Sequence, residues 1–394
     1  MGLNDTPLGE RVHIAFFGCA NAGKSSLLNA VTGVDTAVVS SLKGTTTDPV
    51  YKTMELLPAG PVVIIDTPGL DDESILGAQR TAKAAEVMRK TDVAVVVVDA
   101  EKGLRKEDEE IIEKLKKAGI NYVTVYNKAD LISSKHKENA VYVSAKTNEG
   151  IDELKLLIAE KADISKKSKP IVSDIVKSGS YVLLVIPIDK AAPKGRLILP
   201  QQQVIRELLD FGCIPVEVRE SGLEKVIGDM GERISLVITD SQVFRYAAEK
   251  VPESIPLTSF SILFSRYKGD LKAQLKGIDA VKTLKSGDRV LISEGCAHHR
   301  QCGDIGTVKI PAALKALTGK NLSFSFTSAG EFPENLSEYR IVIHCGACML
   351  NEKEMKARLS SARSQNIPVT NYGMLLALAS GVLERGLKPL KGDF

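Results

Sequence analysis

The sequence predicts an α/β protein of three domains, on the basis of three observations. The chain has 394 residues, more than one hydrophobic core usually serves, since a domain averages about 150 residues. Apolar runs rich in Val and Ile alternate with helical patterns, which is typical of mostly parallel sheets flanked by helices. A lysine-rich segment at 161–170 ends in proline and interrupts this alternation, so it is interpreted as a linker.

The first α/β block precedes the linker. Its predicted strands are 11–18, 51–58, 62–66, 93–100, 122–128 and 140–145. Its predicted helices include 23–33, 84–91, 107–119 and 150–162. Because several of the strands are continuously apolar, we expect both faces of their sheet to be covered.

Two further α/β blocks follow the linker. The second has a helical pattern at 201–212 and apolar runs at 180–189, 214–220, 234–244 and 255–264. A helix-compatible run at 269–288 leads into the third, whose apolar runs are 289–296, 341–346 and 367–386. The predicted domains are therefore 1–165, 171–266 and 267–394.

Composition and charge argue against several classes of protein. Hydrophobic residues make up 44% and charged residues 26% of the chain, as in ordinary soluble globular proteins. The formal net charge of +3 is small for this length and gives no reason to expect nucleic acid as a partner. No segment approaches the ~20 apolar residues of a membrane span, and the first residues do not resemble a signal peptide. We therefore expect a cytoplasmic protein with no membrane or nucleic-acid partner.

A phosphate-binding loop is predicted between the first strand and the first helix. The segment "GCANAGKS", Gly18 to Ser25, matches G-x-x-x-x-G-K-[ST] in the strand–loop–helix context that this motif requires. Gly18 and Gly23 let the backbone N–H groups wrap around phosphates, Lys24 reaches the β- and γ-phosphates, and Ser25 ligates magnesium. The other loop residues predicted to contact nucleotide are Asn21, Ala22 and Ser26.

Two motifs downstream complete a predicted magnesium site. "GTTTD" at 44–48 offers Thr46 as a second metal ligand on a switch loop. "DTPG" at 66–69 ends a strand, where Asp66 holds the metal through its water shell and the Gly69 N–H senses the γ-phosphate. Lys24, Ser25 and these three residues are the predicted catalytic set.

The last two motifs predict recognition of guanine. "NKAD" places Asn127, Lys128 and Asp130 at the end of a strand, and Asp130 can accept from both the N1–H and the 2-amino group of guanine. Adenine offers neither donor, so a site built around this bond rejects it by factors of order 10⁴. "VSAK" then closes over the base with Ser144, Ala145 and Lys146. Five motifs in this order predict a GTP hydrolase that uses Mg²⁺.

The motif set resembles the TrmE–Era branch of GTPases, which implies a six-stranded sheet flanked by helices. Asn21 stands where cation-activated members of that branch ligate potassium, so the resemblance implies K⁺ as a cofactor. Leu70 follows "DTPG" where Ras-like enzymes carry a water-orienting Gln. Without that side chain, hydrolysis is expected to be slow unless a monovalent cation or a partner completes the site.

Cysteines and histidines cluster in the third block. Four of the six cysteines and three of the five histidines lie there, namely Cys296, Cys302, Cys345, Cys348, His298, His299 and His344. A redox pair would explain the C-x-x-C at 345–348 but not the other members of the cluster. A four-thiolate zinc site and an iron–sulfur cluster held by Cys296, Cys345 and Cys348 both remain compatible with the residues.

A second resemblance bears on this cluster. The pattern C-x-H from Cys296 to His298 and H-C-x-x-C from His344 to Cys348, behind a TrmE–Era-like GTPase domain, resembles the FeFe-hydrogenase maturation GTPases, the HydF family. The resemblance covers the whole chain and implies a 4Fe–4S cluster on Cys296, Cys345 and Cys348 in the last domain. It also implies a labile fourth position that His298 or His344 occupies or borders. Each of these histidines could equally well lie beside the cluster ligands without binding the metal.

The resemblance further implies a function and partners. The chain would be a scaffold or carrier that receives a di-iron precursor as cargo and delivers it to apo FeFe-hydrogenase. Radical-SAM maturation enzymes would be its other partners, and the middle domain would form a homodimer. The alternative is a TrmE–Era-like GTPase directed to the ribosome or tRNA, with a structural zinc module.

Overall fold

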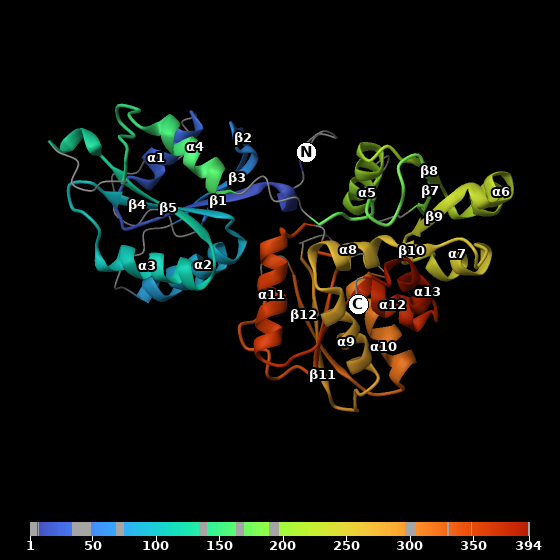
Figure 1. Cartoon of the computed structure of the whole chain (residues 1–394). Coiled ribbons are helices and arrows are strands. Elements are labelled where there is room, and N and C mark those ends of the chain that lie inside the picture. Colours follow the sequence, from blue (N-terminus) through green and yellow to red (C-terminus); the bar gives the residue numbers. More distant parts are fainter. Residues whose placement is uncertain are drawn as a thin grey trace. The chain divides into compact units, whose positions relative to one another are not determined.

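The computed structural model describes residues 6, 8–33, 49–67, 75–133, 140–162, 169–188, 197–295, 304–328, 331–347 and 349–392. The chain divides into two compact units, Met1–Lys167 and Ser168–Phe394 (Figure 1). The second unit thus contains both the middle and the last predicted domain, and each contributes a sheet of its own.

The first unit is built on a six-stranded sheet in the order β2-β3-β1-β4-β5-β6. Its strands are β1 (Val12–Phe17), β2 (Val50–Leu56), β3 (Gly60–Asp66), β4 (Val93–Asp99), β5 (Asn121–Asn127) and β6 (Val141–Tyr142). Only β2 runs antiparallel to its neighbour, so the predicted mostly parallel sheet is confirmed. Its helices are α1 (Lys24–Thr32), α2 (Ile75–Lys90), α3 (Lys106–Lys117) and α4 (Ile151–Lys161).

Alternate residues of these strands belong to two separate cores. Ile14 and Phe16 of β1 pack with Leu27 and Leu28 of α1, whereas Ala15 and Phe17 contribute to the core on the other side. Because successive side chains of a strand point to opposite faces, a continuous apolar run is needed when both faces are covered. The Val-rich β4, buried along its whole length, is the clearest case.

The first sheet of the second unit has the order β10-β9-β7-β8, and all of its strands are parallel. These strands are β7 (Tyr181–Val185), β8 (Ile214–Val218), β9 (Ile234–Thr239) and β10 (Leu257–Ser259). The helices between and after them are α5 (Leu199–Asp210), α6 (Leu223–Met230), α7 (Phe244–Lys250) and α8 (Phe260–Lys268).

The second sheet of this unit has the order β12-β11-β13-β14 and is also parallel. Its strands are β11 (Arg289–Ser293), β12 (Ser323–Thr327), β13 (Ile341–His344) and β14 (Val369–Asn371). The helices of this part are α9 (Leu271–Val281), α10 (Ile310–Thr318), α11 (Glu352–Ser364), α12 (Tyr372–Ala379) and α13 (Leu383–Leu387). Strand β12 was not among the predicted elements.

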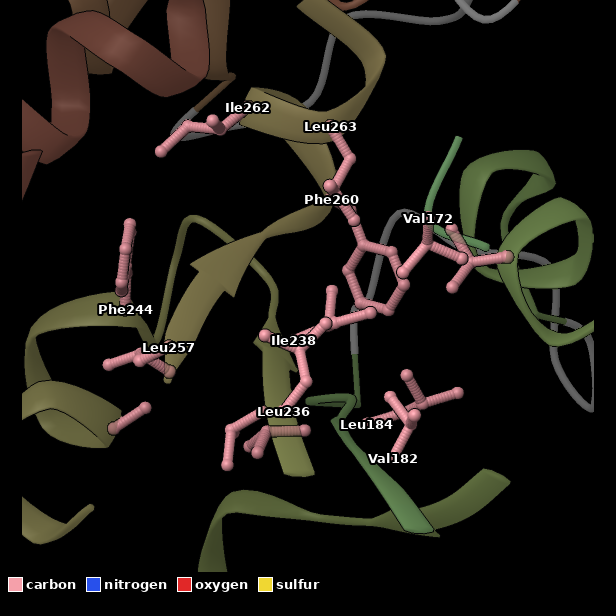
Figure 2. Packing of buried hydrophobic residues seen from close by; sticks show 14 of the residues in the cluster. Val172, Val182, Leu184, Leu236, Ile238, Phe244, Leu257, Phe260, Ile262 and Leu263 are labelled. Atoms are coloured by element: carbon pink, nitrogen blue, oxygen red, sulfur yellow. The ribbon is translucent and has the colours of Figure 1, made fainter. Parts of the chain in front are cut away.

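One hydrophobic core joins distant parts of the second unit. Figure 2 shows Phe260 of α8 between Val172 and Ile238. The same core includes Leu383 and Leu387 of α13, near the end of the chain. The C-terminal helix therefore packs with residues of the first sheet, which explains why the two parts form one compact unit.

The apolar run at 255–264 changes from strand to helix at Ser259. Strand β10 ends there, and α8 begins because the Ser259 side chain accepts a hydrogen bond from the Ile262 N–H. A serine at this position satisfies an N–H that the first turn of a helix leaves without a partner. Continuous hydrophobicity in the sequence hides this change, since both elements are buried.

Candidate functional site

The phosphate loop of the first unit joins β1 to α1. Gly18 has a φ of 144° and Gly23 a φ of 85°, both in the region that favours glycine. A Cβ on Gly18 would also collide with the backbone carbonyl of Val97. The buried Lys24 donates to the carbonyl oxygens of Gly18 and Cys19 over 3.0 and 2.9 Å. Its ammonium group therefore lies within the loop, where the phosphate oxygens of a bound nucleotide could replace these carbonyl oxygens as acceptors.

Ser25 and Asp66 meet beside this loop. Ser25 Oγ donates to Asp66 Oδ2 over 2.8 Å, and Asp66 Oδ1 is buried with no hydrogen-bond partner among the described residues. Burial raises the pKa of Asp66, while the Ser25 hydrogen bond and the nearby Lys24 oppose the increase. A hydroxyl next to a poorly solvated carboxylate suits a hydrated Mg²⁺ ion. The other predicted residues of this site, Thr46 and Gly69, lie outside the described residues.

Asn127 connects the phosphate loop to the base-binding segments. It ends β5 and is 2% exposed. Its Nδ2 donates to the Ala22 carbonyl and its Oδ1 accepts from the Ala145 N–H, both over 3.1 Å. A single amide thus fixes the distance between the loop predicted to bind phosphates and the segment predicted to close over the base.

Asp130, the carboxylate predicted to recognise guanine, is held in place by Ser144 of the last motif. Ser144 Oγ donates to Asp130 Oδ1 over 2.6 Å. Lys128 adopts a left-handed conformation, with φ of 66°, and its Nζ donates to Asp99 Oδ2 over 2.6 Å. The structure therefore brings the described members of the predicted nucleotide set to one edge of the sheet, with Asn21 and Lys146 exposed.

Sequence reasoning missed a contact behind the phosphate loop. Cys19 donates from Sγ to Asp108 Oδ1 over 3.3 Å, and both residues are buried. Asp108 also accepts from the Arg105 N–H at the start of α3. No sequence signal marked this pair, because the residues lie far apart in the chain.

The two halves of the cysteine pattern leave neighbouring strands of the second unit. Strands β11 and β13 are parallel, with Ser293 opposite His344. The chain beyond both strands therefore emerges at one edge of the sheet, where sites of open α/β sheets form. Glu294 and Gly295 lead there to Cys296, and His344 leads to Cys345. The other members of the cysteine and histidine cluster lie outside the described residues, namely Cys296, His298, His299, Cys302 and Cys348.

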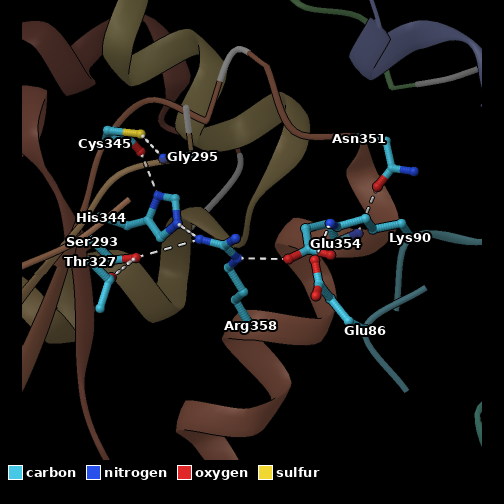
Figure 3. A network of polar contacts seen from close by, with 10 residues as sticks. All are labelled: Glu86, Lys90, Ser293, Gly295, Thr327, His344, Cys345, Asn351, Glu354 and Arg358. Carbon is cyan, nitrogen blue, oxygen red and sulfur yellow. Dashed lines mark hydrogen bonds and ion pairs between the residues drawn. The ribbon is translucent and has the colours of Figure 1, made fainter. Parts of the chain in front are cut away.

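Two backbone N–H groups point at the sulfur of Cys345. Gly295 N lies 3.1 Å from Cys345 Sγ (Figure 3). Ala347 N lies 3.4 Å from the same sulfur, and the cysteine is only half-buried. A Cβ on Gly295 would lie 2.8 Å from the Leu350 side chain, so a larger residue does not fit without displacement. N–H donors stabilise a thiolate and occur around the sulfurs of iron–sulfur sites. The residue before Cys296 thus lies in contact with the thiol of Cys345.

His344 is buried and both of its ring nitrogens are engaged. It is 1% exposed, with Nδ1 2.9 Å from the Cys345 carbonyl oxygen and Nε2 3.1 Å from Arg358 Nη1. Burial and the Arg358 charge lower the pKa of His344 to about 3, so the ring is neutral. The identity of a fourth cluster ligand stays a prediction.

Other buried polar residues at this edge had no sequence signal of their own. Glu294 is 5% exposed and accepts from Tyr372 Oη over 3.4 Å. Burial and the Glu294 charge raise the pKa of Tyr372. Arg358 and Glu354 form a buried ion pair one helical turn apart on α11. Within the described residues no three His, Cys, Asp or Glu side chains converge on a metal position.

Known GTPases resemble part of this chain. GTPase Der of Kosmotoga olearia is 31% identical over 217 residues, covering 49% of this chain and 48% of that protein. The tRNA modification GTPase MnmE of Dechloromonas aromatica is 39% identical over 158 residues, covering 38% and 34%. The chain thus spans about half the length of the first relative and about a third of the second. Aquifex aeolicus Era bound to GDP.AlF4- is 20% identical, with 52% and 92% covered and a TM-score of 0.35.

Matches to family models then define the class and the family. Residues 13–128 match the model described as 50S ribosome-binding GTPase, so the first unit is a P-loop GTPase domain. Residues 171–269 match the hydrogen maturase F dimerization domain, and residues 272–389 match the hydrogen maturase F tetramerization domain. The chain belongs to the hydrogen maturase F (HydF) family, which confirms the predicted resemblance. In the described parts of the chain, the helices are too short or too polar to cross a membrane.

Proposed function

We propose that this protein hydrolyses GTP and assembles iron–sulfur cargo for FeFe-hydrogenase. It would act as a scaffold or carrier that receives a di-iron precursor and delivers the subcluster to the apo-enzyme. The observation that carries the proposal is the pairing of β11 with β13, which leads both halves of the cysteine pattern to one sheet edge. The contact between the Gly295 N–H and Cys345 Sγ supports it, because Gly295 directly precedes Cys296 in the chain.

The proposed cluster site uses three thiolates and leaves one position open. Cys296, Cys345 and Cys348 would hold a 4Fe–4S cluster, with His298 or His344 at or beside the fourth position. When bound, the cluster would supply an iron with an exchangeable coordination position for the cargo. Cys345 fits this role because it is half-buried, and two N–H donors stabilise its sulfur in the charged form.

The proposed GTPase site assigns each polar residue a separate task. Lys24 binds the phosphates, and Ser25 and Asp66 hold Mg²⁺ together with Thr46. The Gly69 N–H would report the presence of the γ-phosphate, and Asn127 and Asp130 select guanine. GTP would switch partner exchange and take no part in the chemistry of cluster assembly, since the two sites belong to different units.

Self-association is proposed to involve the first sheet of the second unit. The match to a dimerization domain covers this sheet, and β8 lies at its open edge. Leu209 and Phe211 precede this edge strand and Ile214 begins it; they are 54%, 42% and 44% exposed. Apolar side chains at a sheet edge are well suited to burial against a second copy of the chain. Radical-SAM maturation enzymes and apo-hydrogenase are the other proposed partners, on the basis of family membership.

Metal analysis of anaerobically prepared protein tests the proposed function. After reconstitution with iron and sulfide, we expect about four irons and four sulfides per chain and the optical and EPR signals of a 4Fe–4S cluster. Cys345→Ser should lose most of this iron, whereas Cys213→Ser should retain it, because Cys213 is buried in the other core of that unit. Protein that has also received the di-iron precursor from the proposed radical-SAM partners should restore activity to apo-hydrogenase, whereas protein that carries the 4Fe–4S cluster alone should not.

The result that would reject the proposal is stoichiometric zinc with no iron–sulfur signal. That outcome would favour the alternative, a GTPase directed to the ribosome or tRNA with a structural zinc module. The resemblance of part of this chain to MnmE is the observation that keeps this alternative in view. The HydF-specific matches over residues 171–269 and 272–389 weigh against it.

A further inference from the structure

A buried ion pair lies behind Cys345 and has no part in the tasks assigned above. The side chains of Arg358 and Glu354 are each 1% exposed, and Arg358 Nε donates to Glu354 Oε1 over 2.9 Å. Arg358 Nη1 lies 3.1 Å from His344 Nε2 and 3.4 Å from Ser293 Oγ (Figure 3). Moving two charges out of water often costs more free energy than their attraction returns. A buried pair of this kind is therefore better explained by positioning than by stability.

The arginine determines which nitrogen of His344 carries the proton. A guanidinium group has only donors, so His344 Nε2 must accept the hydrogen bond from Arg358. The proton of the neutral ring is then on Nδ1, which donates to the Cys345 carbonyl oxygen over 2.9 Å. A chain of three hydrogen bonds thus runs from the Glu354 carboxylate to the backbone of Cys345.

The backbone that receives this chain of hydrogen bonds is strained. Ala347, two residues beyond Cys345, has a φ of 54° and is buried. A non-glycine residue in this conformation costs free energy and persists only when its surroundings hold it. The conformation aims the Ala347 N–H at Cys345 Sγ. Fixing the Cys345 carbonyl therefore also fixes the direction from which an N–H reaches its sulfur.

A second buried cation holds the far end of the same loop. Lys268, 3% exposed at the end of α8, donates from Nζ to the Leu350 carbonyl over 3.0 Å. Asn351 then caps α11 by accepting from the Glu354 N–H over 2.9 Å. His344 therefore holds the backbone at Cys345, and Lys268 of α8 holds it at Leu350.

We propose that Arg358 is a positioning residue that presets Cys345 and its backbone for metal capture, acting through His344. This rests on the proposed function, in which Cys345 and Cys348 hold an iron–sulfur cluster. The chain pairs Arg358 with Glu354 so that the guanidinium is held at one end while it orients His344 at the other. The imidazole then orients the Cys345 carbonyl, with no need to contact metal itself.

The test replaces the ion pair as a unit and compares it with a matched pair on the same helix. The double variant Arg358→Met with Glu354→Leu removes both charges at similar volume, so no lone charge is left buried. The control is Glu352→Gln with Lys356→Met, which removes the exposed pair of the same spacing on α11. Circular dichroism and thermal unfolding confirm that each variant folds before any metal is added.

Two measurements follow on the full chain. The first is the rate at which a chelator strips iron from the reconstituted protein, expected to rise about tenfold to hundredfold in the buried-pair variant, the usual range for residues that orient metal ligands. The second is hydrogen exchange of the amides of residues 345–350 in metal-free protein, which should also accelerate in that variant. The control should match the wild type in both.

His344 variants separate positioning from ligation. His344→Asn keeps a donor that can reach the Cys345 carbonyl, whereas His344→Leu keeps none. We expect His344→Asn to retain iron more nearly like the wild type than His344→Leu does, with the wild-type EPR spectrum. A changed spectrum in His344→Asn would instead indicate that the ring is a ligand and would overturn the proposal.

The outcomes distinguish this inference from the proposed function. If the wild type binds no iron–sulfur cluster, the proposed function fails, and amide exchange in metal-free protein still decides whether Arg358 holds the loop. If the cluster forms but the buried-pair variant matches the control in both iron loss and exchange, the positioning role is wrong and the proposed function stands.

Discussion

Asp66 shows at the scale of one residue how a binding site can be held ready at the expense of stability. Its carboxylate is 7% exposed, and one of its oxygens lacks a hydrogen-bond partner among the described residues. Desolvation raises the pKa of this group in the folded state. The charged form is therefore less stable in the folded protein than in the unfolded chain, unless a cation is bound.

Replacing Asp66 should stabilise the metal-free protein. Because the pKa of Asp66 is raised in the folded state, its ionisation lowers the free energy of unfolding. This loss is absent at pH values below the unfolded pKa of 3.8 and grows as the pH rises through the folded pKa. Asp66→Asn should therefore raise the free energy of unfolding at neutral pH by about 1 kcal/mol, a typical gain at a strained site, and abolish GTP hydrolysis. Thermal unfolding without nucleotide or Mg²⁺, at a series of pH values, measures this. Glu113→Gln, at an exposed carboxylate, is the control, and a less stable Asp66→Asn at neutral pH would contradict the argument.

Asn21 carries the proposed response to potassium. It lies exposed on the phosphate loop with a φ of 62°, a conformation that asparagine and glycine tolerate. GTP hydrolysis should be faster in KCl than in NaCl at equal ionic strength by roughly tenfold or more, which is about 1.4 kcal/mol of transition-state stabilisation. Asn21→Gly preserves the backbone conformation and removes the side-chain oxygen, so it should make the two rates equal. Equal rates in the wild type would refute the role of Asn21.

At the scale of secondary structure, β8 is an edge strand that contains a proline, which limits hydrogen bonding of this edge to strands of other molecules. Pro215 lacks an N–H and is opposite Val182 of β7, its only strand neighbour within the described sheet. Proline is largely confined to edge strands because it cannot donate to a ladder. Contact with another copy would therefore depend on apolar side chains such as Ile214 more than on extension of the sheet.

A charge at this edge should weaken self-association. Ile214→Lys would bury an unpaired ammonium in the proposed contact, and we expect the dissociation constant to rise by at least about tenfold. Sedimentation over a range of protein concentrations measures the change. Leu156→Lys on α4 of the first unit is the matched control, since Leu156 is 60% exposed. If the two variants behave alike, the contact does not lie at this edge.

At the scale of the whole molecule, the two proposed sites belong to separate compact units. The nucleotide site lies within Met1–Lys167 and the cysteine site within Ser168–Phe394. Each unit has its own cores, so a change at one site need not disturb the packing around the other. Substitutions that share no packing or hydrogen-bond partners usually have independent effects.

Single variants should therefore separate the two activities. Lys24→Ala removes the cation that binds phosphates and should reduce GTP hydrolysis by at least about 100-fold while leaving the iron and sulfide content unchanged. Cys345→Ser should have the reverse effect. Parallel measurements of phosphate release and of iron per chain decide this, with thermal unfolding as the check on folding. Failure of Lys24→Ala to load iron would show that nucleotide binding is required for cluster assembly.

The arrangement of the candidate nucleotide site could be predicted because its parts are local motifs on consecutive elements. Lys24 and Ser25 open the first helix, and Asp66 and Asn127 each end a strand of one mostly parallel sheet. The carboxyl ends of parallel strands share one edge, so order along the chain was enough to predict that these residues meet. The contact between Cys19 and Asp108 could not be predicted in this way, because it depends on how α3 packs.

What the sequence alone determined is the class of fold, the family resemblance and the residue types of both candidate sites, since each is encoded in local patterns of spacing and hydrophobicity. Only the tertiary structure decided what surrounds those residues. Arg358 looks like an ordinary helix-surface residue in the sequence, yet it is buried against His344 because α11 packs beside the ends of β11 and β13. The C-terminal helix α13 likewise joins the core of the first sheet of that unit. Contacts between segments distant in the chain depend on how whole faces of helices and sheets pack together, and they cannot be predicted from a local sequence pattern.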